Sequence, residues 1–261
     1  MPRRIVACGG EQLSYPALTR YLLDLAAKTR PKILFVPTAS GDDAANLLSF
    51  YQAFAGLGCE PSHLLLFNRT IDDIDGFVRS QDVVMVGGGN TANMLAIWRL
   101  HGVEDALRNA YRNGTILTGW SAGCICWFEA GITDSFTMEL GPLRDGLKLL
   151  EGSACPHYDS QERRRPVYAR EIAAGLPSGI ALDDGVAARY DDEHLVEIVS
   201  ARPEGRAFSV DGSGEHPLAA SARATPLRRP RSTRRRARGS TPRRRRRSAS
   251  CACFRRSARG S

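Results

Sequence analysis

The sequence lacks the features that would assign it to a membrane, secreted or metal-binding class. None of its apolar runs approaches the ~18 residues of a membrane-spanning helix. The N-terminus enters a strand-like run almost directly, without the apolar stretch and cleavage site of a secretory signal. The seven cysteines have no framework spacing, and the pairs Cys124-x-Cys126 and Cys251-x-Cys253 lack the second half of a zinc site. We therefore expect a cytoplasmic protein with reduced thiols, without a membrane segment or a metal.

Positive charge is scarce in most of the chain and abundant at its C-terminal end. Residues 211–261 hold 16 arginines, no lysine and two acidic residues, whereas residues 1–210 hold 20 basic and 26 acidic residues. The net charge of +8 over 261 residues therefore describes neither part. The C-terminal part also lacks periodicity and large apolar residues, so it cannot offset the entropy of ordering. We predict one α/β domain over residues 1–210 and a disordered arginine-rich tail over residues 211–261.

Three interpretations of the tail fit its composition. Arginine, serine, alanine and proline dominate it from an abrupt start, which is typical of a shifted reading frame of GC-rich DNA. An inert tail is the second interpretation. The third is an arm in which the run Arg243–Arg247 binds nucleic acid or another acidic surface. We expect no nucleic-acid binding by the rest of the chain.

Apolar runs and helical spacing alternate along residues 1–210. Near-continuous apolar runs predict strands that are buried on both faces, within the segments 5–8, 32–40 (where Pro37 stops the run), 63–67, 82–90 (where the strand runs into a glycine loop) and 115–120. Helical spacing predicts helices between them, at 15–29, 42–58, 73–79, 91–100 and 103–113. This order predicts an α/β fold with a mostly parallel sheet and helices on both faces, because such strands connect by right-handed crossovers. Short runs after Pro177 predict an antiparallel portion at its flank.

Loops rich in small residues follow four of these strands, at 9–10, 37–41, 87–90 and 120–123. In open α/β sheets, ligands bind beyond the carboxyl ends of the strands. We therefore expect the four loops to share one edge of the sheet and to hold the functional residues.

One of these loops places a serine between two glycines. The stretch from Gly119 to Gly123, "GWSAG", fits the pattern G-x-S-x-G at a strand–helix junction. On such a turn the serine hydroxyl projects over the sheet edge, and the N–H of Ala122 can bond a developing oxyanion. The pattern predicts a nucleophilic Ser121, against the alternative of a serine packed in a tight turn. A glutamine amidotransferase of similar layout would carry cysteine at this position.

A nucleophilic serine needs a base, and His157 is the best placed of the five histidines. It lies in the turn-like segment "ACPHYD", between a predicted helix and a polar stretch, on the C-terminal side of the serine. The base in turn needs an acid that orients its ring. Asp134, Asp159, Asp183 and Asp184 are candidates, and their spacing does not choose among them.

The glycine loop "VGGGNT" follows one strand and opens a helix. Its exposed N–H groups fit a phosphate cradle, although the loop matches neither the Walker pattern nor G-x-G-x-x-G. They also fit the second half of an oxyanion hole, in which Gly88 or Gly89 donates opposite Ala122. A plain tight turn is the third interpretation.

Four segments together resemble the dipeptidase E and cyanophycinase family of serine peptidases: "GGGNT", "GWSAG", "WFEAGITDS" and "CPHYD". The resemblance runs from residue 4 to about 210 and is closest to the bacterial peptidase E-like branch. It implies a flavodoxin-like doubly wound sheet with Ser121 as nucleophile and His157 as base. It implies Asp134 as the acid, or Asp184 if the cyanophycinase arrangement applies. Gly88, Gly89 and Ala122 match the oxyanion region of the family.

The resemblance also implies the substrate class. Family members cleave dipeptides with an N-terminal aspartate or β-aspartyl-linked arginine polymers, and both substrates need a cation for their carboxylate. Arg165, in the segment "ERRRP", and Arg170 are the candidate cations, unless these residues form a solvated charge run. Asn90 is a further candidate for substrate binding. We expect a serine exopeptidase of small peptides that needs no cofactor and is a monomer or homodimer; the alternatives are a non-catalytic binding protein and a β-aspartyl peptidase.

Overall fold

The computed structural model describes residues 2–222. The predictions made for Arg243–Arg247, Cys251 and Cys253 lie outside these residues. Within the described part, no helix combines the length and the apolar character needed to cross a bilayer.

The larger of two sheets carries the predicted parallel strands. Its strands in chain order are β1 (Arg4–Cys8), β2 (Lys32–Val36), β3 (Glu60–His63), β4 (Val83–Val86), β5 (Ile116–Trp120), β10 (Val186–Asp191), β11 (His194–Ser200) and β14 (Ser221–Ala222). They lie in the order β14-β11-β10-β1-β5-β4-β2-β3. The five neighbouring strands β1, β5, β4, β2 and β3 are parallel to one another. At the flank, β10 pairs antiparallel with β1, and β11 pairs antiparallel with β10. The α/β prediction with an antiparallel C-terminal portion is confirmed.

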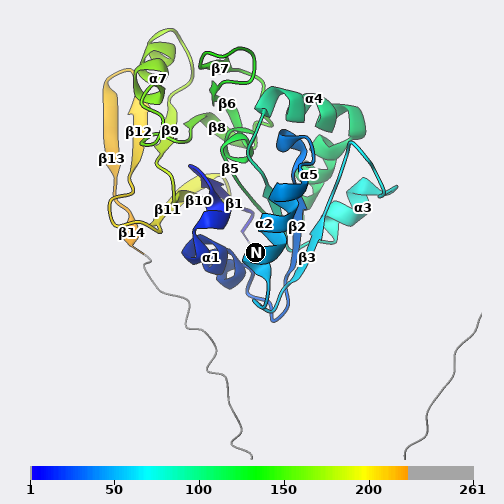
Figure 1. The fold of residues 1–261 in the computed structure, drawn as a ribbon. Helices are drawn as coiled ribbons and strands as arrows, with labels where there is room; N and C mark the ends of the chain where they lie inside the picture. The colour runs from blue at the N-terminus through cyan, green and yellow to red at the C-terminus, as the bar shows by residue number, and fades with distance from the viewer. Residues whose placement is uncertain (1, 223–261) are drawn as a thin grey trace, which may run out of the picture. The chain divides into compact units, whose positions relative to one another are not determined.

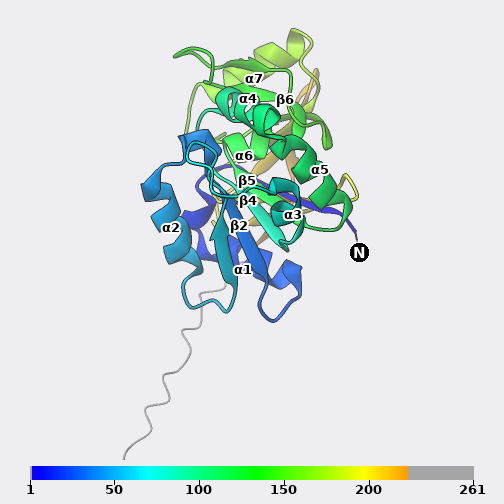
Figure 2. The same cartoon turned by 90° about the vertical axis from the view of Figure 1, so that its right-hand side faces the viewer.

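Helices cover both faces of this sheet, as the buried strands require. The helices α1 (Pro16–Ala26) and α2 (Ala44–Phe54) pack on one face, around Phe50 and Phe54. The helices α3 (Ile74–Arg79), α4 (Thr91–His101) and α5 (Val103–Arg112) pack on the other, around Trp98. Figure 2 shows α2 and α3 on opposite sides of β2 and β4.

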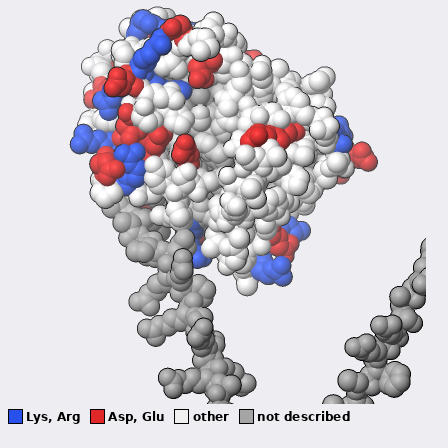
Figure 3. All heavy atoms as spheres, viewed as in Figure 1, with Lys and Arg blue, Asp and Glu red and all other residues white. Residues whose placement is uncertain are grey.

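A second sheet was not expected from the sequence. Its strands in chain order are β6 (Phe128–Thr133), β7 (Gly141–Leu143), β8 (Leu150–Cys155), β9 (Gly179–Leu182), β12 (Ala207–Asp211) and β13 (Gly214–Leu218). They lie in the order β13-β12-β9-β8-β6-β7, and α7 (Arg164–Ala173) packs on them around Tyr158, Tyr168 and Phe208. In Figure 1 this sheet and α7 lie in the upper left, away from β2 and β3. Charged side chains of both signs gather over the same region in Figure 3.

Three sequence-based assignments of elements were wrong. The third strand is Glu60–His63 rather than 63–67. The N–H of Leu64 makes the last hydrogen bond to β2, and the N–H groups of Leu66 and Phe67 donate to the side chain of Asp42 instead of to a strand. The segment before His157 is the strand β8 rather than a helix. The ordered fold continues past residue 210, because β13 pairs with β12 as a polar hairpin whose exposed side chains carry no apolar signal.

Candidate active site

Ser121 occupies a strained turn between β5 and the short helix α6 (Ala122–Ile125). Its φ of 55° and ψ of −114° lie outside the conformations that L-residues adopt readily. The flanking glycines are required by close packing: a β-carbon at Gly119 would lie 2.6 Å from the carbonyl oxygen of Val86, and one at Gly123 would lie 2.3 Å from the same atom. The small residues of "GWSAG" therefore let two backbone segments touch while the serine side chain stays partly exposed at the turn.

The glycine loop after β4 lies beside this serine. A β-carbon at Gly88 would lie 3.2 Å from Cβ of Ser121 and 3.1 Å from Nε1 of Trp120. Within residues 2–222 the N–H groups of Gly88 and Gly89 donate no hydrogen bond, whereas those of Gly87 and Asn90 do. The N–H of Ala122, in the first turn of α6, has no acceptor inside its helix. Free backbone donors therefore lie close to Ser121.

His157 and Asp184 form a hydrogen-bonded pair. Nδ1 of His157 lies 2.7 Å from Oδ1 of Asp184, and both side chains are largely buried, with exposed fractions of 14% and 17%. The two residues follow the parallel neighbours β8 and β9, whose register pairs Cys155 with Ala181. Burial raises the pKa of Asp184, but hydrogen bonds from His157 and Ser160 outweigh it, so the net pKa lies below the ordinary value. Asp184 is therefore a carboxylate, and Nδ1 of His157 donates to it.

The end of β1 connects this pair with Ser121. β1 runs beside β5, with Cys8 opposite Trp120, so Gly9 and Gly10 leave the sheet next to the turn at residue 121. The N–H of His157 donates to the carbonyl of Gly9, at 3.3 Å. A β-carbon at Gly10 would lie 2.6 Å from Cε1 of His157. The imidazole thus lies over the strand end adjacent to the one that carries the serine.

The other candidate acids lie elsewhere. Asp134 follows β6 on the surface, and its side chain makes no hydrogen bond or ion pair within residues 2–222. Asp159 accepts the N–H of Asp184 and pairs with Arg202. Asp183 is buried and accepts the N–H of Arg206. The structure therefore pairs His157 with the reserve candidate Asp184, and the preference for Asp134 has no support in this geometry.

The three proposed substrate-binding residues are engaged with other protein groups. Asn90 caps α4 by accepting the N–H of Asn93, and its amide donates to the carbonyl of Ser135. Arg165 pairs with Glu215 and stacks on the rings of Tyr158 and Phe208. Arg170 is exposed and pairs with Glu171 on its own helix. None of the three therefore supplies a free cation or a free hydrogen-bond donor at the site.

Arg164 is a functional candidate that we did not single out from the sequence. Its side chain is 3% exposed, and it donates to the carbonyl of Ile132 (2.7 Å) and to Oε1 of Gln161 (2.8 Å). Both partners are neutral, as is the buried thiol of Cys155 beside it, and within residues 2–222 Arg164 forms no ion pair. A buried cation ordinarily needs a compensating charge. The run of three arginines in "ERRRP" indicated a cation in this segment, but only the packing of the folded chain decides which of the three side chains is buried.

The cysteines near Ser121 are not reactive thiolates. Cys8, Cys124, Cys126 and Cys155 are fully buried. Burial raises the pKa of all four thiols, to about 12 for Cys8 and Cys155. Because the thiolate is the nucleophilic form, these residues are inert at neutral pH.

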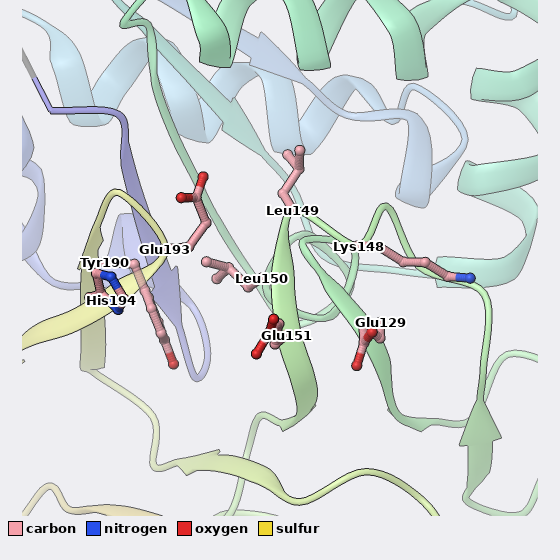
Figure 4. A pocket seen from close by; sticks show the side chains of 8 residues that line it. All are labelled: Glu129, Lys148, Leu149, Leu150, Glu151, Tyr190, Glu193 and His194. Atoms are coloured by element: carbon pink, nitrogen blue, oxygen red, sulfur yellow. The ribbon is translucent and has the colours of Figure 1, made fainter.

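A cavity of about 480 Å³ lies between the start of β8 and the β10–β11 turn. Figure 4 shows Glu129 and Glu151, from β6 and β8, together with Glu193 from the turn and His194 from the start of β11. Two of its acidic side chains already have partners: Glu193 binds Arg3, and Glu129 accepts the N–H of Gly152. The cavity contains none of the predicted site residues.

The chain is similar to known peptidases in sequence and in fold. The sequence model of peptidase family S51 matches residues 5–198. The chain is 43% identical over 224 residues to an uncharacterized peptidase, YgaJ, of Bacillus subtilis (strain 168), covering 83% of this chain and 95% of that protein. It is 28% identical over 186 residues to peptidase E of Haemophilus influenzae (strain ATCC 51907 / DSM 11121 / KW20 / Rd), covering 64% and 81%. A peptidase structure from an acI-B1 actinobacterium superimposes with a TM-score of 0.64 at 19% identity, covering 84% and 95%. The chain therefore belongs to peptidase family S51.

Proposed function

We propose that this peptidase is a serine exopeptidase in which Ser121 is the nucleophile, His157 the general base and Asp184 the acid that orients the base. One observation carries the proposal. The His157–Asp184 pair lies at the end of β1, beside the strained turn that presents Ser121. Ser121 would then lie on a nucleophile elbow, in which strain holds the hydroxyl clear of the sheet.

The proposed reaction follows from which atoms remain free. Asp184 holds Nδ1 of His157, so Nε2 accepts the proton of Ser121 as its oxygen attacks the scissile carbonyl. The N–H groups of Ala122 and of Gly88 or Gly89 stabilise the oxyanion, each contributing about 3 kcal/mol. His157 then gives its proton to the leaving amine, and water releases the acyl group by the same steps in reverse.

Arg164 supports an acidic substrate. Arg164 is the first residue of α7, and its guanidinium donates to the carbonyl of Ile132, near the carboxyl ends of β6 and β8. A guanidinium without a carboxylate partner there would be compensated by the side chain of an N-terminal aspartate, once the side chain of Arg164, which is 3% exposed, becomes accessible to the substrate. We therefore propose short peptides that begin with aspartate as substrates.

The nucleophile is tested by replacing Ser121 with alanine and measuring hydrolysis of Asp-X dipeptides. We expect loss of activity and of labelling by a fluorophosphonate probe, while circular dichroism stays unchanged. Ser80→Ala, on a surface helix end, is the matched control and should retain both. Full activity in the Ser121 variant would reject the mechanism, and a wild-type protein that the probe does not label would favour a non-catalytic role.

The substrate class is tested with Arg164→Gln and Arg170→Gln. We expect the first change to lower kcat/KM for Asp-X relative to Asn-X by about tenfold or more, because a hydrogen-bonded charge pair would be lost. The second should leave the ratio unchanged, since Arg170 is occupied by Glu171 on the surface. An unchanged ratio in a folded Arg164 variant would reject the acidic-substrate proposal.

A further inference from the structure

Asp184 lies in a turn where the chain passes from one sheet to the other. β9 belongs to the second sheet and β10 to the first, and only Asp183, Asp184 and Gly185 connect them. Gly185 has a φ of +72°, so the turn has left extended geometry. The position of the Asp184 carboxylate therefore depends on what holds this turn.

Two charged side chains hold the backbone of Asp184 from both sides. Its N–H donates to Oδ1 of Asp159 at 2.9 Å, and its carbonyl accepts from Nη1 of Arg202 at 3.1 Å. Nη1 of Arg202 also donates to Oδ2 of Asp159, at 2.7 Å. The three contacts close a ring around one peptide segment, so Asp184 cannot rotate without breaking at least one charge-assisted hydrogen bond.

Arg202 is itself fixed, as a positioning residue must be. Nε donates to Glu204 at 2.8 Å, and the hydroxyl of Ser200 bonds both the carbonyl and the N–H of residue 202. Its stem lies against Gly185: a β-carbon there would be 3.1 Å from Cδ of Arg202. Arg202 and Asp159 are each about three-quarters buried, unlike the mobile surface pairs that contribute little.

We propose that Asp159 and Arg202 are positioning residues that fix the backbone of Asp184 and thereby aim its carboxylate at His157. The inference rests on the proposed function. Neither residue touches Ser121 or the reacting atoms in this arrangement, so both act through Asp184. Loss of either should misalign the His157–Asp184 hydrogen bond and slow proton transfer from Ser121, without changing how the substrate binds.

The test is a double-mutant cycle with the second-order rate of fluorophosphonate labelling as its readout. We expect Arg202→Gln to slow labelling about tenfold, and to lower kcat for a dipeptide with little change in KM. In an Asp184→Asn background the same change should have less than about a twofold effect, because the carboxylate through which Arg202 acts is already gone. Arg79→Gln, which removes an exposed ion pair with Asp75, is the matched control and should label at the wild-type rate.

The outcomes separate this inference from the proposed function. A wild-type protein that is not labelled at Ser121 rejects the function itself. Normal labelling of Arg202→Gln, or an equal loss in both backgrounds, overturns the positioning role while leaving the function standing. If Arg202→Gln does not fold, Asp159→Asn gives the same test, because it keeps the acceptor for the N–H of Asp184 and removes only the charge that holds Arg202.

Discussion

Gly10 packs directly against Asp184: a β-carbon at position 10 would lie 1.9 Å from Oδ1 of the carboxylate. The same added carbon would lie 2.6 Å from both Nδ1 and Cε1 of His157. The glycine at the end of β1 therefore leaves the space that the His157–Asp184 pair occupies. The proposed catalytic geometry therefore requires glycine, which has no side chain, at position 10.

We expect Gly10→Ala to lower kcat/KM by about 100-fold, because a displacement of the pair by about 1 Å costs that much in alignment. Steady-state kinetics with a dipeptide substrate measures it. Gly212→Ala is the control, since a β-carbon there meets nothing within 4 Å, and it should behave as wild type. Wild-type kinetics in a folded Gly10 variant would mean that the pair is not needed in this position.

The two candidate acids make opposite predictions. Asp184→Asn should lower kcat by about 10³- to 10⁴-fold, because an amide no longer fixes the imidazole tautomer or stabilises its charged form. Asp134→Asn should have little effect, since this side chain is exposed and has no partner among residues 2–222. Kinetics of the two variants decide between the acids, and the reverse order of effects would restore the sequence-based choice.

Strain at Ser121 predicts an unusual order of stabilities. Because its φ is 55°, glycine fits this turn without the steric cost that alanine carries. We expect Ser121→Gly to have a free energy of unfolding about 1 kcal/mol higher than Ser121→Ala, although both lack the nucleophile. Urea unfolding monitored by circular dichroism measures the difference.

Ser80 supplies the control for that comparison. Its backbone is ordinary right-handed helix, with a φ of −75°, so alanine there should be more stable than glycine. If the glycine variant is the less stable one at both positions, the turn at Ser121 stores no strain.

The buried Asp183 predicts a pH-dependent stability. Burial raises its pKa, and Oδ1 has no hydrogen-bond partner within the described residues. Since the folded state then binds the proton more tightly than the unfolded state, ionisation costs stability as the pH rises above the ordinary pKa of about 4. Asn keeps the acceptor for the N–H of Arg206 and carries no charge. The free energy of unfolding of Asp183→Asn minus that of wild type should therefore increase between pH 3.5 and pH 7. A difference that stays constant over this range would contradict the prediction.

The buried thiols predict resistance to alkylation. Iodoacetamide at neutral pH should leave Cys8, Cys124, Cys126 and Cys155 unmodified and activity intact, because burial raises their pKa and blocks access. Cys59 is partly exposed and should react faster. Peptide mapping by mass spectrometry resolves each site. Modification of Cys124 with loss of activity would point to a thiol mechanism instead.

Much of the first sheet could be predicted because its signals are local. Apolar runs at β1, β2, β4 and β5 read as buried strands, and "GWSAG" marked the turn at Ser121. The second sheet was not predicted as a separate sheet, although β9 and β12 lie among the short runs predicted after Pro177. β13 consists of largely exposed side chains whose strand conformation depends on pairing with β12. Tertiary pairing overrides weak local preference in such segments.

The sequence by itself determined the parallel core, the loops that follow its strands and the residue types available for catalysis, because periodicity and glycine placement act over a few residues. Only the tertiary structure decided that His157 meets Asp184 rather than Asp134, and that Arg164 turns inward while Arg170 stays on the surface. The first choice depends on how β8 and β9 align beside the end of β1, and the second on how α7 packs against β6. That alignment is set by packing between segments far apart in the chain, which spacing along the sequence does not encode.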